Sequence, residues 1–227
     1  MIFLLLACAP KPVAPTAPTL PPSVSAETVK IHMSMNFTTA VAARDAVLAG
    51  NVEGAQARLA KLGAVTDLSL IAEAGVPFLS ALQAAAKTGE AATTVSDLGT
   101  VIGSVSLTCG NCHTHFNAGL SPAVASPPTP GGSHAAASTW LVDALWTGVV
   151  ANADTAWTTG AAALAANPKD LAGYGVTTAT PAAQDALNTL ATQVAAAPVA
   201  TTGEARASTL GKVVGACGAC HAARRTD

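Results

Sequence analysis

The sequence predicts an all-α fold, and three observations support this prediction. Alanine, the residue with the highest helix propensity, occupies 53 of the 227 positions. Aromatic residues make up only 4% of the chain, so the aromatic and β-branched runs typical of strands are scarce. Half of the residues are hydrophobic and 11% are charged, which excludes a disordered chain. The formal net charge of −2 provides no basic surface, so nucleic acid is not an expected partner.

The chain begins with a short apolar segment, residues 1–8, that ends in a small residue followed by Cys8. This pattern is typical of an export signal, and it resembles a bacterial lipobox, in which the cysteine becomes lipidated. Six prolines within residues 9–22 exclude a helix and favour an extended segment. We therefore expect residues 9–25 to act as a tether and Cys8 to anchor the protein to a membrane of the periplasm or cell envelope.

The remainder of the chain divides into two alanine-rich halves that look like copies of one unit. The halves are residues 26–118 and 134–227, and a proline- and glycine-rich linker, residues 119–133, separates them. His32 is followed fourteen residues later by Ala-Val-Leu-Ala, and His134 is followed at the same spacing by Gly-Val-Val-Ala. Each half also contains Leu-Gly-x-Val and ends in Cys-x-x-Cys-His, so an internal repeat is indicated.

Four helices are predicted in each half, and several have a local start signal. Pro77 and Pro181 stand at helix starts, where the missing N–H costs nothing, and Thr180 precedes the second of them as a cap. Thr201 and Glu204 have the spacing of a capping box. Because short loops join the helices, we expect two tandem four-helix bundles. The predicted ranges are 27–49, 52–62, 77–88 and 91–115 in the first half, and 136–151, 153–165, 181–197 and 203–223 in the second.

Both halves end in the pattern to which a c-type haem is attached, Cys-x-x-Cys-His. On a helix, residues i, i+3 and i+4 share one face, so two thiols can bond the haem vinyl groups while the histidine binds the iron. We therefore expect two covalently bound haem c groups in each chain. The first motif consists of Cys109, Cys112 and His113, and the second motif consists of Cys217, Cys220 and His221.

Three other functions of the cysteine pairs are weaker. A zinc site shared by both pairs would have to bridge the 104 residues between Cys112 and Cys217, far more than in a zinc ribbon. A thioredoxin-like redox pair requires a preceding strand, whereas the sequence here predicts a helix. A disulfide within either motif would close a loop too short to stabilise the fold appreciably.

Four helices with Cys-x-x-Cys-His at the end of the last one resemble the class II c-type cytochromes, which have the cytochrome c′ fold. The resemblance implies that each haem lies between the first and last helices of its half. It also implies that an arginine after the motif lies near the haem propionates, which makes Arg224 and Arg225 candidates. Two haems in one chain depart from the usual single-haem member.

The resemblance places the sixth iron ligand on the first helix of each half. Gas-binding members leave this position open, whereas low-spin members fill it with a side chain. His32 and His134 occupy equivalent positions, which favours bis-histidine coordination at both haems. Met33 or Met35 is the alternative sixth ligand at the first haem. The second half contains no methionine, so this alternative does not exist at the second haem.

These expectations define an exported electron carrier, not an enzyme, that passes single electrons between redox partner proteins. One alternative is a sensor or scavenger of nitric oxide or carbon monoxide with an open distal site. A second alternative is a di-haem peroxidase, which would need acid or base groups beside an open iron. Charge is sparse near both motifs, which disfavours the peroxidase.

Overall fold

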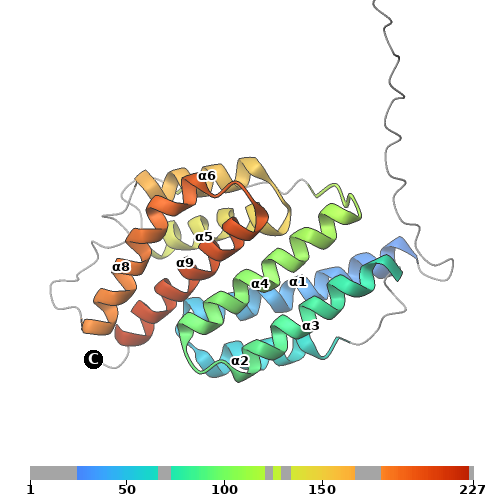
Figure 1. Ribbon diagram of the computed structural model, residues 1–227, viewed down its shortest axis with the longest axis horizontal. Helices are drawn as coiled ribbons and strands as arrows, with labels where there is room; N and C mark the ends of the chain where they lie inside the picture. Colours follow the sequence, from blue (N-terminus) through green and yellow to red (C-terminus); the bar gives the residue numbers. More distant parts are fainter. Residues whose placement is uncertain (1–24, 66–72, 121–124, 129–133, 167–179, 225–227) are drawn as a thin grey trace, which may run out of the picture.

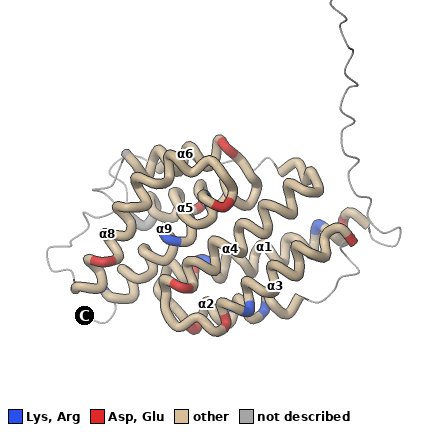
Figure 2. The backbone as a smooth tube through the Cα atoms, viewed as in Figure 1, with Lys and Arg blue, Asp and Glu red and all other residues tan. Residues whose placement is uncertain are grey.

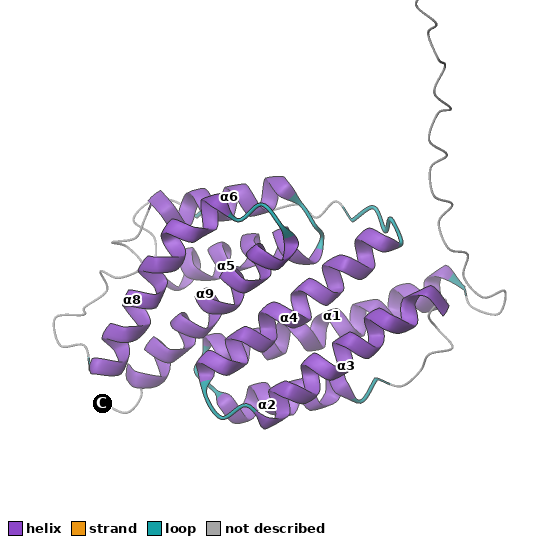
Figure 3. Cartoon of the chain, in the orientation of Figure 1, coloured by secondary structure: helices purple, strands orange, loops and turns teal. Residues whose placement is uncertain are grey.

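The computed structural model describes residues 25–65, 73–120, 125–128, 134–166 and 180–224, and its regular structure there is entirely helical (Figures 1 and 3). The all-α class predicted from the sequence is confirmed for these residues. The first half contains α1 (Ala26–Leu48), α2 (Val52–Gly63), α3 (Val76–Ala91) and α4 (Val95–His115). The second half contains α5 (His134–Val150), α6 (Asp154–Ala166), α8 (Pro181–Ala196) and α9 (Gly203–Arg224). Short 3₁₀ turns are η2 (Glu73–Gly75) and η4 (Ala197–Val199).

Most helix starts follow from local sequence. Four helices, α1, α2, α4 and α8, begin after a side chain that accepts a backbone N–H bond: Ser25, Asn51, Thr94 and Thr180. The predicted capping box at Thr201 is wrong. The hydroxyl of Thr202 instead accepts the N–H of Ala205 at 3.2 Å, and α9 begins at Gly203. Threonine is a common capping residue, so either position could cap the helix. The first helical backbone bond, from the N–H of Arg206 to the carbonyl of Thr202, makes Thr202 the cap.

The two halves pack against each other through α4 and α9, which form the most extensive helix contact and lie side by side (Figure 1). The two helices approach through glycines: a Cβ on Gly99 would lie 2.5 Å from the carbonyl oxygen of Gly211. A Cβ on Gly103, one turn later, would lie 2.5 Å from the carbonyl oxygen of Ala207. Because residue numbers rise along α4 as they fall along α9, the two helices are antiparallel. The glycine of the repeated Leu-Gly-x-Val segment therefore serves this backbone-to-backbone contact.

One buried cation connects the halves, and another connects two helices of the second half. Arg44 of α1 is 4% exposed, and its guanidinium lies 2.7 Å from the carboxylate of Asp143 in α5. The same guanidinium lies over the ring of Trp146, 5.3 Å from the centroid. Arg206 of α9 lies over Trp157 of α6 in a similar way, at 5.7 Å. Paired in this manner, the buried cations hold α1 to α5 and α9 to α6.

Charged residues are few and scattered along the described helices (Figure 2). Of the helices that the structure describes, none combines the length and apolar character needed to cross a bilayer. Residues 1–24, which include Cys8 and most of the expected tether, lie outside the described residues.

Candidate functional site

The first motif occupies the last turns of α4, which ends at His115. The helix brings Cys109, Cys112 and His113 to one face, as their spacing predicts. Both cysteines are partly buried and have free thiols. Burial raises the pKa of the Cys109 thiol from 9.0 to about 12, and the neighbouring Cys112 adds to the rise. Burial raises the pKa of Cys112 as well.

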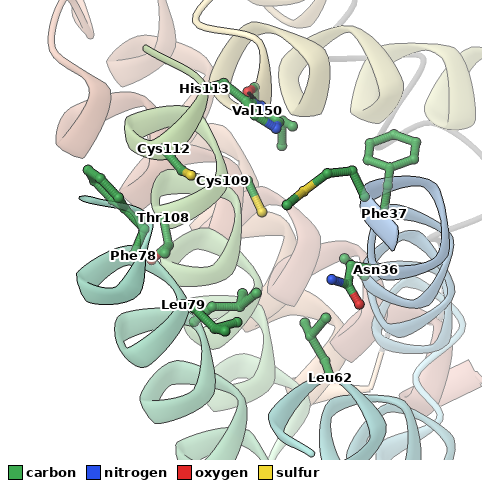
Figure 4. Close-up of a pocket in the computed structure, with 14 residues that line it drawn as sticks. Asn36, Phe37, Leu62, Phe78, Leu79, Thr108, Cys109, Cys112, His113 and Val150 are labelled. Atoms are coloured by element: carbon green, nitrogen blue, oxygen red, sulfur yellow. Dashed lines mark hydrogen bonds between the residues drawn. The ribbon is translucent and has the colours of Figure 1, made fainter. Parts of the chain in front are cut away.

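A largely apolar pocket lies beside the first motif, between α1, α3 and α4 (Figure 4). Cys109 projects into the space that Leu79 of α3 and Phe37 of α1 border (Figure 4). Outside the motif, the polar side chains of this lining are Asn36 and Thr108. Apolar walls with two thiols and an imidazole on one side suit a covalently attached haem, because the thiols can bond the vinyl groups and imidazole is a usual ligand of the iron.

A second, more open pocket continues the first toward the surface. The two pockets share the side chains of Met33, Phe37, His113 and Val150. The outer pocket adds Lys30 to its lining, so a cation stands near the mouth. A haem attached at the first motif would thus be surrounded by apolar side chains in the inner pocket, and one of its edges could reach solvent through the outer pocket.

The ring of His113 is held by a backbone carbonyl. Its Nδ1 lies 2.8 Å from the carbonyl oxygen of Val150, at the end of α5. A carbonyl oxygen only accepts, so Nδ1 must carry the hydrogen and donate it. The lone pair is therefore on Nε2, which is the form that binds a metal ion.

The second motif repeats this arrangement on α9. Burial raises the pKa of the Cys217 thiol to about 12, and the neighbouring Cys220 adds to the rise. The Nδ1 of His221 lies 2.5 Å from the carbonyl oxygen of Leu48, at the end of α1. The same argument gives His221 a hydrogen on Nδ1 and a lone pair on Nε2.

The two motifs lie at opposite ends of the antiparallel pair, as the C-terminal ends of α4 and α9 show in Figure 1. Gly218, inside the second motif, contacts Val95 at the start of α4. Gly110, inside the first motif, is fifteen residues further along α4, which is roughly 23 Å at 1.5 Å per residue. The four thiols therefore cannot share one metal ion, which removes the zinc interpretation. Within the described residues, no group of three or more histidine, cysteine or acidic side chains could hold a metal ion.

The candidate sixth ligands differ in their placement. Met33 lines the pocket beside the first motif, whereas Met35 is 66% exposed. His32 is partly buried, and its Nε2 accepts a hydrogen bond from the Asn36 amide at 3.0 Å. His134 is the first residue of α5, and its side chain lies outside what the structure describes. The structure thus brings Met33 to the first motif.

His115 and Arg224 lie close to the motifs in sequence, but neither lines the pocket beside the first motif. His115 is exposed and packs against the ring of Phe78, with the centroids 5.2 Å apart. Arg224 is exposed at the end of α9, and Arg225 lies outside the described residues. A role for either arginine at the propionates stays a prediction.

Sequence reasoning missed three parts of the site. The carbonyls of Leu48 and Val150 were not predicted as histidine partners, because no side-chain pattern marks a backbone acceptor. Lys30 was not singled out either, since a lone lysine on a helix has no distinctive pattern. A signal for the carbonyls was nevertheless present: both belong to the four-residue segments that are repeated at an offset of 102 residues.

Comparison of the chain with protein-family models, with curated proteins and with solved structures gave no match. The repeated motif and the geometry around it are therefore the grounds on which a function can be proposed.

Proposed function

We propose that the chain is an exported di-haem c-type cytochrome that passes single electrons between redox partner proteins. One observation carries this proposal: Cys-x-x-Cys-His lies in the last turns of the last helix of each half, and both histidines bond a backbone carbonyl through Nδ1, which is the tautomer that binds a metal through Nε2. Bound haem would supply a one-electron iron couple, which is the chemistry of an electron carrier. We propose the class II arrangement for each half, that is, a four-helix bundle with a haem on its last helix.

The protein residues would attach, orient and insulate this group. The thiols of each motif would hold the haem covalently, and the imidazole of the same motif would bind its iron through Nε2. At the first motif, Phe37, Leu62 and Leu79 line the pocket with apolar surface, which would limit the access of water to the haem. Exclusion of water controls the reduction potential, since a low dielectric disfavours the more highly charged oxidation state.

The sixth ligands would differ between the halves. At the first haem we favour Met33, because its side chain lines the pocket, whereas His32 already bonds Asn36. At the second haem we keep His134, because the second half contains no methionine. Methionine ligation raises the reduction potential relative to histidine, so electrons would reside preferentially on the first haem.

Localisation follows from the N-terminal segment. Cys8 after a short apolar run supports lipidation, and residues 9–25 would hold the helical body away from the membrane. Covalent haem attachment through cysteines agrees with an extracytoplasmic location.

Gas binding is the second candidate function. The lining of the first pocket is mostly apolar outside the motif, and an apolar distal side favours a neutral diatomic ligand. In that case neither Met33 nor His32 would bind the iron.

A reduced absorption spectrum with and without carbon monoxide distinguishes the two functions. The protein is produced with its export signal in a host that matures c-type haem. An electron carrier with filled sixth positions keeps its low-spin spectrum when carbon monoxide is added. Immediate carbon monoxide binding at both haems would instead support the gas-binding function.

A further inference from the structure

The histidine hydrogen bonds cross between the two halves of the chain. His113 belongs to the first half and bonds Val150 of α5, whereas His221 belongs to the second half and bonds Leu48 of α1. Leu48 and Val150 are equivalent positions, separated by the 102 residues that relate the first helices of the halves. Each imidazole therefore takes its partner from the opposite half, and the exchange is reciprocal.

The turn that ends α1 explains why the carbonyl of Leu48 is available. The last four carbonyls of a helix have no intrahelical partner. Here the carbonyls of residues 45–47 accept the N–H groups of the following turn, in which Gly50 has φ +66°. The carbonyl of Leu48 is the remaining one, and His221 supplies its donor.

The turn that ends α5 has the same pattern with a different residue. The carbonyls of residues 147–149 accept N–H groups within the turn, and Asn152 takes the left-handed conformation at φ +48°. Glycine and asparagine are the two residues that most readily adopt this conformation. The carbonyl of Val150 is again the one that remains, and His113 supplies its donor.

A glycine inside each motif lets the opposite helix approach. Gly110 and Gly218 directly follow the first cysteine of their motifs. A Cβ on Gly110 would overlap the carbonyl oxygen of Val149, and a Cβ on Gly218 would overlap that of Val47. From the other side, a Cβ on Gly50 would lie 2.7 Å from the carbonyl oxygen of Gly218. The Cys-x-x-Cys-His pattern does not require a particular residue after the first cysteine. The contact between the halves therefore explains why both motifs have glycine there.

We propose that each half of the chain positions the iron-binding histidine of the other half. The end of α1 positions His221 and the end of α5 positions His113, an inference that rests on the proposed haem-binding function. A hydrogen bond at Nδ1 fixes the ring and makes Nε2 a stronger electron donor. A stronger donor stabilises the oxidised iron, so loss of this bond raises the reduction potential of the haem concerned.

The variant Gly50→Ala tests the crossing, because it alters the first half and is expected to act on the second haem. The added Cβ meets the backbone of the second motif and displaces the end of α1 from His221. In the full haem-loaded chain, a redox titration resolved into two components should show a positive shift of the second haem alone. Chains that lack the cysteines of one motif carry a single haem, and their titrations show which redox component belongs to which haem.

The control is Asn152→Gly, which changes the equivalent position of α5 without adding an atom. This substitution relieves the positive φ, so neither potential should move. A Gly50→Ala shift confined to the first haem, or no shift at either haem, would overturn the inference.

If Gly50→Ala does not fold, the unaltered reduced chain provides the answer by nuclear magnetic resonance. The Nδ1 proton of His221 should show a nuclear Overhauser contact to Leu48 or Ala49, and contacts only within its own half would overturn the inference. A chain without covalent haem would already refute the proposed function. Two attached haems with contacts only within each half would refute the crossing alone.

Discussion

Among single residues, Met33 has the position that favours histidine–methionine ligation of the first haem over bis-histidine ligation. It lines the pocket beside the first motif, whereas the imidazole of His32 bonds Asn36. We expect Met33→Leu to open the sixth position of the first haem, because leucine keeps the apolar volume but has no ligand atom. A carbon monoxide difference spectrum should then show binding at one haem of the two. The matched control, His32→Ala, should leave the spectrum unchanged. If His32→Ala allows carbon monoxide to bind and Met33→Leu does not, His32 is the sixth ligand and the first haem has bis-histidine ligation.

His134 is the corresponding residue of the second half, where no methionine competes. We expect His134→Ala to convert the second haem to a high-spin form that binds carbon monoxide. His134→Met should keep the low-spin spectrum and raise the potential of this haem. Unchanged spectra for both variants would show that His134 is not the ligand.

The buried thiols predict a pH dependence that haem attachment removes. Cys109 and Cys217 have pKa values of about 12 in the folded chain, compared with an ordinary value of 9.0. The unfolded chain therefore loses these protons first, so the stabilisation is complete below pH 9 and is lost as pH rises toward 12. Urea unfolding at pH 8 and pH 10 should show a larger loss for the haem-free chain than for the haem-loaded chain, whose thioethers do not titrate. Equal losses would contradict this account of the thiols.

At the scale of helices, the contact between α4 and α9 depends on glycine. A Cβ on Gly99 would meet backbone atoms of Gly211 and Gly215 at 2.5–2.7 Å, and backbone cannot move aside as a side chain can. We expect Gly99→Ala to lower the free energy of unfolding by about 1–3 kcal/mol, although alanine has the higher helix propensity.

Gly63→Ala is the matched control for this helix contact. Its Cβ would first meet the flexible Glu90 carboxylate, at 3.2 Å, so its effect should be neutral or stabilising. Urea unfolding of both variants measures the difference. Equal effects at Gly99 and Gly63 would show that the α4–α9 contact is looser than the structure indicates.

The helices could be predicted from the sequence because their signals are local. Alanine content, the prolines at helix starts and caps such as Thr180 place the predicted helices close to the bounds of the α-helices that the described residues form. The pairing of α4 with α9 could not be predicted, because it depends on which distant backbone meets each glycine. The repeated Leu-Gly-x-Val was visible in the sequence, yet a small residue on a helix does not specify its partner.

At the scale of the whole molecule, the chemistry of the site could be predicted but its assembly could not. The two motifs specify thiols and imidazoles by residue type, so the haem attachment that we propose could be formulated from their spacing alone. The partners of His113 and His221 are backbone carbonyls from the opposite half, and no residue type encodes such an acceptor. The tertiary packing of α1 and α5 against the motifs supplies this information.

The proposed function depends above all on two covalent haems in each chain, one at each motif. The most direct measurement is the haem content of the purified, exported chain, from the pyridine haemochrome spectrum and the mass of the denatured protein. We expect two haems per chain that survive denaturation, and one haem after Cys217→Ala with Cys220→Ala. A mature chain without covalent haem, or an unchanged haem content in that double variant, would contradict it.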